Sequence, residues 1–235
     1  MSDIPYKIPQ QDGLDEFYYI HYTALIKNNT EKPYFTENDI VEKIKENKEG
    51  FFDFSKNMVD IGACYGAYAM LLDYNHNYCF EPNKWFTCLI YSNMYLKDKV
   101  NNTDVYNVAL GDEDKIIKFD GFYCEGCECT YLNTNSMYEV QCKMLDEYYL
   151  ENIDFIKIDI EGFEERAIRG GLGTIIRNNY PSILFECWDV GVNGMTQEKH
   201  DSLFNLLKSL GYNIFEYWGS ADTHLAIHNS KLKNS

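Results

Sequence analysis

The chain has 235 residues, of which 45% are hydrophobic, and its 21 Lys and Arg against 37 Asp and Glu give a formal net charge of −16. This length suits one domain of ordinary size with a continuous core. No basic run interrupts the acidic composition, so nucleic acid and anionic membrane surfaces are not expected as partners. A neutral or cationic partner is expected instead. No N-terminal apolar stretch resembles a signal peptide or could span a bilayer, and we therefore expect a cytoplasmic protein.

Residues 1–50 read as an N-terminal extension that is polar and rich in tyrosine. The segment 36–39, Thr-Glu-Asn-Asp, resembles a capping box, and Ile40, Val41 and Ile44 follow on one face of a predicted helix. We expect this extension to pack on the ligand cleft or to close it. A passive cover over one face of a sheet is the alternative.

Residues 51–235 form the predicted main domain, in which strands and helices alternate. Such alternation indicates an α/β fold, a Rossmann-like, doubly wound and mostly parallel sheet, and the short final connection makes the last strand antiparallel. The strands of the sheet are predicted over 58–61, 78–80, 105–110, 155–159, 182–185, 213–217 and 224–227. Two further strands, over 116–119 and 139–144, form a β-rich excursion. Helices are predicted after Gly66 and over 145–150, 164–169 and 200–210.

The most informative stretch begins at residue 58, where an apolar run ends in Asp60 and is followed by Gly62 and Gly66. A second apolar run ends in Glu81, which is 81 − 60 = 21 positions after Asp60. An acid in that place can accept hydrogen bonds from both ribose hydroxyls of an adenosine. The glycines lack the Gly-x-Gly spacing of a pyrophosphate cradle, so the pattern favours S-adenosylmethionine, which carries adenosine without phosphate. An ordinary strand-helix-strand unit, whose glycines only serve the turn, is the alternative interpretation.

Eight cysteines are present, and Cys79, Cys142 and Cys187 lie in apolar strand patterns, where they behave as small hydrophobic residues. The segment 124–129 holds Cys124, Cys127 and Cys129. A zinc site there would need a fourth ligand, and none follows at a useful spacing, so a loop of free thiols is expected.

Three blocks resemble the FkbM-like branch of the class I S-adenosylmethionine-dependent methyltransferases. They are Val-Asp-Ile-Gly-Ala at 59–63, Phe-Glu-Pro-Asn at 80–83, and Phe-Ile-Lys-Ile-Asp-Ile-Glu-Gly-Phe-Glu at 155–164, and they occur in the order of that family. The resemblance implies a seven-stranded sheet whose last strand is antiparallel, and O-methylation of hydroxyls on sugars, glycans or related small molecules.

Carried over position by position, the resemblance also implies a set of cofactor-binding residues. The methionine end of the cofactor would contact Asp60, Gly62, Ala63 and Gly66, together with Tyr68 from the same motif. Glu81 would hold the ribose, and Pro82 and Asn83 would border the adenosine. Ala109 and Leu110 would lie at the edge of the adenine.

Acidic residues also gather at the predicted carboxyl ends of the strands, where open parallel sheets bind ligands. Asp159, Glu161 and Glu186 are expected to converge there, and His224 is expected to begin the last strand at the same edge. Glu161 or His224 would act as a base on the acceptor hydroxyl, or Asp159 and Glu186 would hold Mg²⁺ or Mn²⁺ and lower the pKa of that hydroxyl. The structural alternative is that Asp159 caps the next helix and Glu161 serves its first turn.

Other classes of function fit parts of the same pattern. A nicotinamide-dependent oxidoreductase would suit the strand-helix-strand unit and Glu81, but the chain lacks the third glycine of such enzymes. A non-catalytic Rossmann-like module that keeps a cofactor for stability would suit the pattern too, and so would a protein methyltransferase.

Overall fold

The computed structural model describes residues 38–120, 138–216, 218 and 222–232. The main compact unit begins at Asp39 and therefore includes the helix predicted before residue 50. That helix is α2 (Asn38–Glu46), and the expected face, Ile40, Val41 and Ile44, is buried. Residues 1–37 of the predicted N-terminal extension and the loop of Cys124, Cys127 and Cys129 lie outside the described residues, and the role of the extension stays a prediction.

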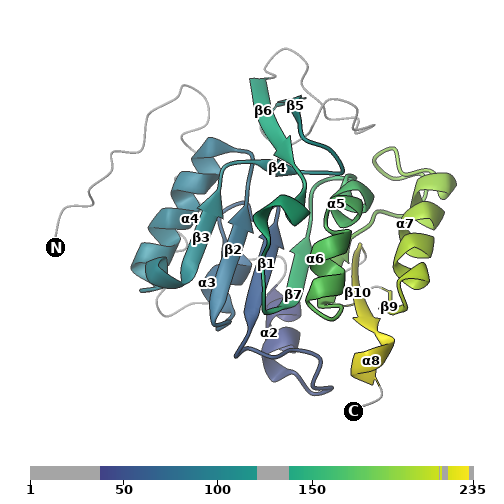
Figure 1. Cartoon of the computed structure of the whole chain (residues 1–235), viewed down its shortest axis with the longest axis horizontal. Helices are drawn as coiled ribbons and strands as arrows, with labels where there is room; N and C mark the ends of the chain where they lie inside the picture. The colour runs from purple at the N-terminus through teal and green to yellow at the C-terminus, as the bar shows by residue number, and fades with distance from the viewer. Residues whose placement is uncertain (1–37, 121–137, 217, 219–221, 233–235) are drawn as a thin grey trace. The chain divides into compact units, whose positions relative to one another are not determined.

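Among the described residues, the large sheet has seven strands in the order β3-β2-β1-β7-β8-β10-β9 (Figure 1). Neighbouring pairs from β3 to β8 are parallel, whereas β10 is antiparallel to both β8 and β9. The expected Rossmann-like α/β sheet with an antiparallel last strand is thus confirmed. The strands are β1 (Asn57–Ile61), β2 (His76–Phe80), β3 (Thr103–Tyr106), β7 (Ile153–Ile158), β8 (Ser182–Glu186), β9 (Tyr212–Phe215) and β10 (Thr223–His228).

Helices cover both faces of this sheet, so its central strands are buried on two sides. In Figure 1, α5 and α6 lie in front of the sheet and α2 and α3 lie behind it. Every residue of β1 and β7 is buried, as expected for strands that are covered twice. The remaining bounds are α3 (Ala67–Leu71), α4 (Lys84–Leu96), α5 (Glu164–Gly170), α6 (Leu172–Arg177), α7 (Gln197–Ser209) and α8 (Asn229–Leu232), with a 3₁₀ turn η1 (Val100–Asn102).

The excursion forms a second, three-stranded sheet among the described residues, in the order β4-β6-β5. Its strands are β4 (Ala109–Leu110), β5 (Lys115–Phe119) and β6 (Tyr138–Lys143). The predicted single strand over 105–110 is therefore wrong: the chain leaves the large sheet after Tyr106 and pairs with β6 from Ala109 onward. The helix predicted over 145–150 is a short 3₁₀ turn, η2 (Leu145–Tyr148). Figure 1 places the small sheet beyond one end of the large sheet.

A close backbone contact ties this small sheet to the helical layer. A Cβ atom on Gly170, at the end of α5, would lie 1.8 Å from the carbonyl oxygen of Gly111, which follows β4. Only glycine allows two backbones to approach so closely. The contact fixes α5 against the region through which the chain passes from one sheet to the other.

Candidate functional site

The turn after β1 is built around glycines in the left-handed region. Gly62 has a φ of +74°, and a Cβ atom on it would lie 1.9 Å from the carbonyl oxygen of Asp159, at the end of β7. Gly66 has a φ of +78° and immediately precedes α3. Gly62 therefore lets the turn lie directly against the neighbouring strand, and Gly66 lets it lie against Ile90 and Met94 of α4.

Glu81 follows β2 and braces this turn. Its carboxylate accepts hydrogen bonds from the backbone N–H groups of Cys64, at 2.9 Å, and of Asn83, at 2.7 Å. Asn83 in turn caps α4, because its side chain accepts from the N–H group of Trp85. Burial raises the pKa of Glu81 to about 8, against the effect of the two N–H donors. The residue predicted to hold the ribose thus also holds the glycine turn and the start of a helix.

A buried cation lies between the glycine turn and the end of β7. The Nζ of Lys157 donates to the carbonyl oxygen of Gly62 at 2.9 Å, and it lies 3.7 Å from Asp60 Oδ1 and 3.4 Å from Asp159 Oδ2. Asp60 is fully buried, burial raises its pKa, and neither of its oxygens has a hydrogen-bond partner among the described residues. Lys157 therefore supplies the countercharge that this buried carboxylate needs.

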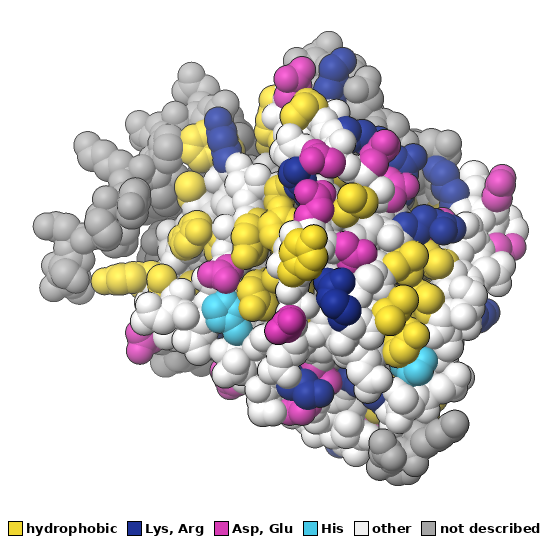
Figure 2. All heavy atoms as spheres, viewed as in Figure 1, with side chains coloured by type: hydrophobic (Ala, Val, Ile, Leu, Met, Phe, Trp, Pro, Cys, Tyr) yellow, Lys and Arg dark blue, Asp and Glu magenta, His cyan; other side chains and the backbone are white. Residues whose placement is uncertain are grey.

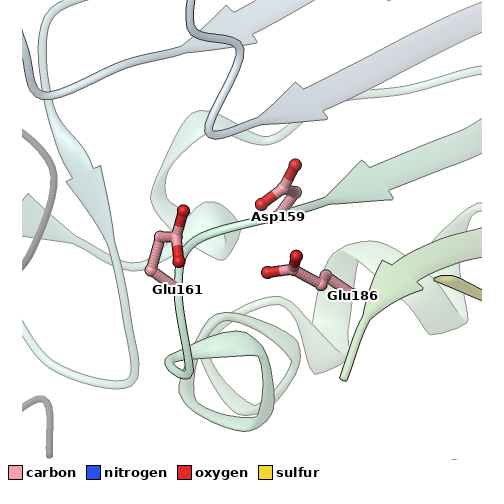
Figure 3. A group of neighbouring side chains, drawn as sticks. All are labelled: Asp159, Glu161 and Glu186. Carbon is pink, nitrogen blue, oxygen red and sulfur yellow. The ribbon is translucent and has the colours of Figure 1, made fainter. Parts of the chain in front are cut away.

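Asp159, Glu161 and Glu186 converge at the ends of β7 and β8, as predicted (Figure 3). One oxygen from each lies within 4.8 Å of the others. Glu161 has a φ of +60°, and the loop that carries it is held by the buried Glu164, whose Oε1 accepts from the N–H groups of Ile160 and Gly162. The strained turn therefore aims Glu161 at the cluster while Glu164 points the other way, into the loop backbone.

The cluster favours protons or a cation. Burial, followed by the charge of Asp159, raises the pKa of Glu161 to about 7. Burial and the charges of Asp159 and Glu161 raise the pKa of Glu186 well above its usual range. Glu186 Oε2 has no hydrogen-bond partner among the residues that the structure describes. An orphaned carboxylate oxygen beside two others fits a divalent cation that prefers oxygen ligands.

A cavity of about 260 Å³ opens at this edge of the large sheet. Its wall is shared by the predicted cofactor residues and by two of the three clustered carboxylates. Of the predicted residues, those that line it are Gly62, Glu81, Pro82, Ala109, Leu110, Asp159 and Glu161.

The other predicted residues stand behind this wall. Glu186 joins the carboxylate cluster without lining the cavity, and Asn83 caps α4. Tyr68 is buried under the Lys157 ammonium, which lies 5.5 Å from the centre of its ring. Asp60, Ala63 and Gly66 shape the turn without being part of the lining.

His224 is the second residue of β10 and pairs with Phe185 near the end of β8, close to the expected place, but its ring is buried in the core. The ring centroid lies 5.3 Å from that of Phe185 and 5.4 Å from that of Phe204, and Nε2 lies 3.1 Å from the carbonyl oxygen of Cys187. Burial lowers its pKa. His224 is not among the residues that line the cavity, and its catalytic role stays a prediction.

Sequence reasoning missed three features of the site. Lys157 could have been found, because a lysine in the middle of an apolar strand that ends in an acid signals a buried ion pair. Glu164 carries no signal that separates it from Glu161, since both follow the same strand. Phe163 and Arg166 line the cavity from the start of α5, and their direction depends on how that helix packs.

The acidic cluster predicts a pH-dependent stability. The folded chain binds a proton at Glu186 more tightly than the unfolded chain does, so the free energy of unfolding should fall as the pH rises from about 5 to 8. Glu186→Gln should flatten this slope and raise the free energy of unfolding at pH 8 by about 1 to 3 kcal/mol. Urea unfolding at several pH values, with chelator present, would measure the free energy of unfolding of each protein. Glu139→Gln, a change at an exposed residue, is the control. Equal slopes for wild type and Glu186→Gln would contradict the assignment.

The fold of this chain is shared by several solved methyltransferase structures. The methyltransferase FkbM from Methylobacillus flagellatus matches with a TM-score of 0.55 and 18% identity over 75% of this chain, which spans 44% of that protein's length. An O-methyltransferase from Bacillus cereus, in complex with SAH, matches with a TM-score of 0.52 and 12% identity, covering 94% of this chain and 92% of that one. A putative rRNA methylase from Clostridium thermocellum matches with a TM-score of 0.52 and 9% identity, covering 80% and 93%.

At such low identities these likenesses establish the fold alone. A search among curated proteins finds no significant match. The family is established by the sequence itself, because the model of the methyltransferase FkbM domain matches residues 60–214, from the buried acid of β1 to strand β9. The chain therefore belongs to the FkbM domain family of methyltransferases and has the fold of S-adenosylmethionine-dependent enzymes.

Proposed function

We propose that this protein transfers a methyl group from S-adenosylmethionine to a hydroxyl oxygen of a sugar, a glycan or a related small molecule, in the cytoplasm. One observation carries the proposal: a single cavity is lined both by Gly62 and Glu81 and by Asp159 and Glu161. The residues proposed to bind the cofactor and the carboxylates that could accept a proton from the acceptor hydroxyl therefore line the same cavity. That proximity is what a direct transfer between two bound molecules requires.

The cofactor half of the proposal rests on the family and on the wall of the cavity. Glu81 lines the cavity and would bind the ribose hydroxyls, and Pro82, Ala109 and Leu110 would supply an apolar surface for a flat base. The Bacillus cereus O-methyltransferase, whose structure holds SAH, has the same fold. A positively charged sulfonium would also meet an acidic environment, which favours its binding.

The acceptor half rests on charge and on the carboxylates. The matched folds include an rRNA methylase as well as an O-methyltransferase, so the fold leaves the acceptor open. A net charge of −16 opposes RNA, and on the face in Figure 2 the Lys and Arg side chains of the described residues lie among Asp and Glu side chains. No helix among the described residues is long and apolar enough to cross a bilayer.

The activation of the hydroxyl falls to the carboxylate cluster. A sugar hydroxyl is a weak nucleophile until its proton leaves. A base positioned to accept that proton typically increases the reaction rate by about 10² to 10⁴-fold. Glu161, with a pKa of about 7, is matched to that task at neutral pH. Asp159 and Glu186 could instead hold Mg²⁺ or Mn²⁺, which would lower the pKa of a bound hydroxyl.

Replacing Glu81 tests the cofactor assignment. Glu81→Ala should weaken SAH binding at least tenfold, because one lost charge-assisted hydrogen bond is worth about 1.5 to 3 kcal/mol. The same change leaves the N–H groups of Cys64 and Asn83 without their acceptor, so the melting temperature should also fall. Glu81→Gln, which keeps one amide oxygen, should be affected less. Calorimetry that shows unchanged SAH affinity in Glu81→Ala would remove Glu81 from the site.

Labelled S-adenosylmethionine tests the reaction. Incubation with free sugars, glycosides, nucleotide sugars, oligosaccharides, RNA and proteins should label the oxygen of a sugar-containing acceptor, as seen by mass analysis of the product. Label on RNA or on protein nitrogen would overturn the acceptor class. Cofactor binding without any product would favour a non-catalytic module, and an absorbance change with a nicotinamide cofactor would favour an oxidoreductase.

Metal dependence separates the two activation mechanisms. If Asp159 and Glu186 hold a cation, chelator should abolish turnover, Mg²⁺ or Mn²⁺ should restore it, and Asp159→Asn or Glu186→Gln should mimic the chelator with SAH affinity nearly intact. If Glu161 or His224 is the base, chelator should have no effect, and Glu161→Gln or His224→Gln should lower turnover. Full activity of metal-stripped protein in excess chelator would exclude the cation.

A further inference from the structure

The cavity has a second wall that neither the cofactor nor the carboxylates use. Lys115, Ile117 and Phe119 line it from alternate positions of β5, and Phe163 and Arg166 line it from the start of α5. Side chains two apart on a strand lie on one face, so the three β5 residues form a continuous surface. These five side chains are apolar except for the two cations, and Asp112, in the loop before β5, lines the cavity as well.

Arg166 differs from the other two arginines because it forms neither an ion pair nor a hydrogen bond with a described residue. The sequence contains three, and the structure describes all of them. Arg169 binds Glu165 through Nε at 2.8 Å and Nη2 at 2.6 Å, and Arg177 donates to the hydroxyl of Thr174. Arg166 forms no ion pair with any described carboxylate, and its guanidinium lies 5.4 Å from the centre of the Phe163 ring.

The other cation of this wall is already neutralised. Lys115 forms an ion pair with Glu113, the second residue before it in the chain. Among the described residues that line the cavity, Arg166 therefore presents the one basic group that forms no ion pair, although the more distant charge of Glu113 acts on it. Stacking on an aromatic ring leaves the edge of a guanidinium, with its N–H donors, available to a ligand.

The chemistry of that edge identifies its ligand. A guanidinium presents parallel N–H donors that match the two oxygens of a carboxylate or phosphate, and such charge-assisted pairs are about twice as strong as neutral hydrogen bonds. We propose that Arg166 binds an oxyanion of the acceptor, so that the acceptor is an anionic hydroxyl compound such as a sugar phosphate or a uronic acid. The inference rests on the proposed function and narrows its substrate class.

The net charge of the protein does not oppose this inference at short range. The value of −16 predicts a neutral or cationic partner, yet charges separated by more than a Debye length, about 8 Å at physiological salt, are largely screened. Within the cavity the nearest charge decides. The wall of Arg166 and Phe163 can thus accept an anion, while Asp159 and Glu161, which line the same cavity, would contact the hydroxyl.

Acceptor pairs that differ only in charge test the inference. The probes are hexose 1-phosphates and hexuronates, each paired with the neutral methyl glycoside of the same sugar. Wild-type protein should methylate the anionic member of a pair with the higher kcat/KM. Arg166→Leu should lose that preference, and its kcat/KM on the anionic member should fall at least tenfold. The kcat/KM of Arg166→Lys on the anionic member should lie between the values of wild type and Arg166→Leu.

Arg169→Leu is the matched control, because Arg169 is exposed on the same helix, is already paired with Glu165 and does not line the cavity. It should keep the wild-type preference. The Arg166 variants should melt at the wild-type temperature, since this side chain is exposed. Calorimetry should show unchanged SAH affinity in Arg166→Leu. A loss of SAH affinity would mean that Arg166 holds the carboxylate of the cofactor and would overturn the inference.

Two further outcomes separate the failure of this inference from that of the proposed function. If neutral glycosides are methylated as well as anionic ones and Arg166→Leu changes neither, the anionic acceptor is wrong while sugar methylation stands. If no probe is methylated although SAH binds, the proposed function fails, and calorimetric titration of the same probes into the SAH complex decides the inference. Anionic probes that bind wild type and Arg166→Leu equally, or bind neither, would then overturn it.

Discussion

The site depends on one close contact, between the turn after β1 and the end of β7. A side chain on Gly62 would overlap the carbonyl group of Asp159, so only glycine lets the two strand ends meet. Lys157 secures the contact by donating to the carbonyl oxygen of Gly62 while it lies near Asp60 and Asp159. The cofactor turn and the first of the clustered carboxylates are therefore parts of one rigid unit. Relative movement between them, which would misplace a methyl group and its acceptor, is opposed by backbone sterics and by a buried charge network.

The second property of the site is an excess of buried acidic groups. Four buried or half-buried glutamates near the cavity, Glu81, Glu161, Glu164 and Glu186, have raised pKa values because burial disfavours their charged forms. Lys157 alone cannot neutralise so many acids. Such a site holds protons until a cation enters, and a sulfonium or a divalent metal ion would both supply the missing positive charge. Another part of the wall carries Arg166, which forms no ion pair with a described carboxylate, so the cavity offers both acidic groups and one basic group to a ligand.

The predictions from sequence succeeded where local pattern decides the outcome. Apolar runs ending in acids placed Asp60, Glu81, Asp159 and Glu186 at one edge of a parallel sheet, because strands joined by helices must run in the same direction. They failed at 105–110, where a continuous apolar pattern spans two strands of different sheets. The pattern of apolar residues reports that both halves are buried, and it carries no information on which strand each half pairs with.

His224 shows the same limit for a single side chain. Its place at the start of the last strand followed from the short connection before it, but the side of the sheet to which the ring points depends on the register between β10 and β8. Glu161 and Glu164 both follow β7, yet Glu161, with its positive φ, lines the cavity, whereas Glu164 binds backbone N–H groups of the loop.

The sequence by itself determined the order of strands and helices, the glycine turn, the acid after the second strand and the gathering of carboxylates at the ends of β7 and β8, since these follow from periodicity, chain direction and residue chemistry. Only the tertiary structure decided that β10 inserts between β8 and β9, that Lys157 joins the glycine turn to Asp159, and that Arg166 shares the cavity with Glu81 and Glu161. These features arise from contacts between segments far apart in the chain, and packing at such contacts is set by the whole core rather than by any local run of residues.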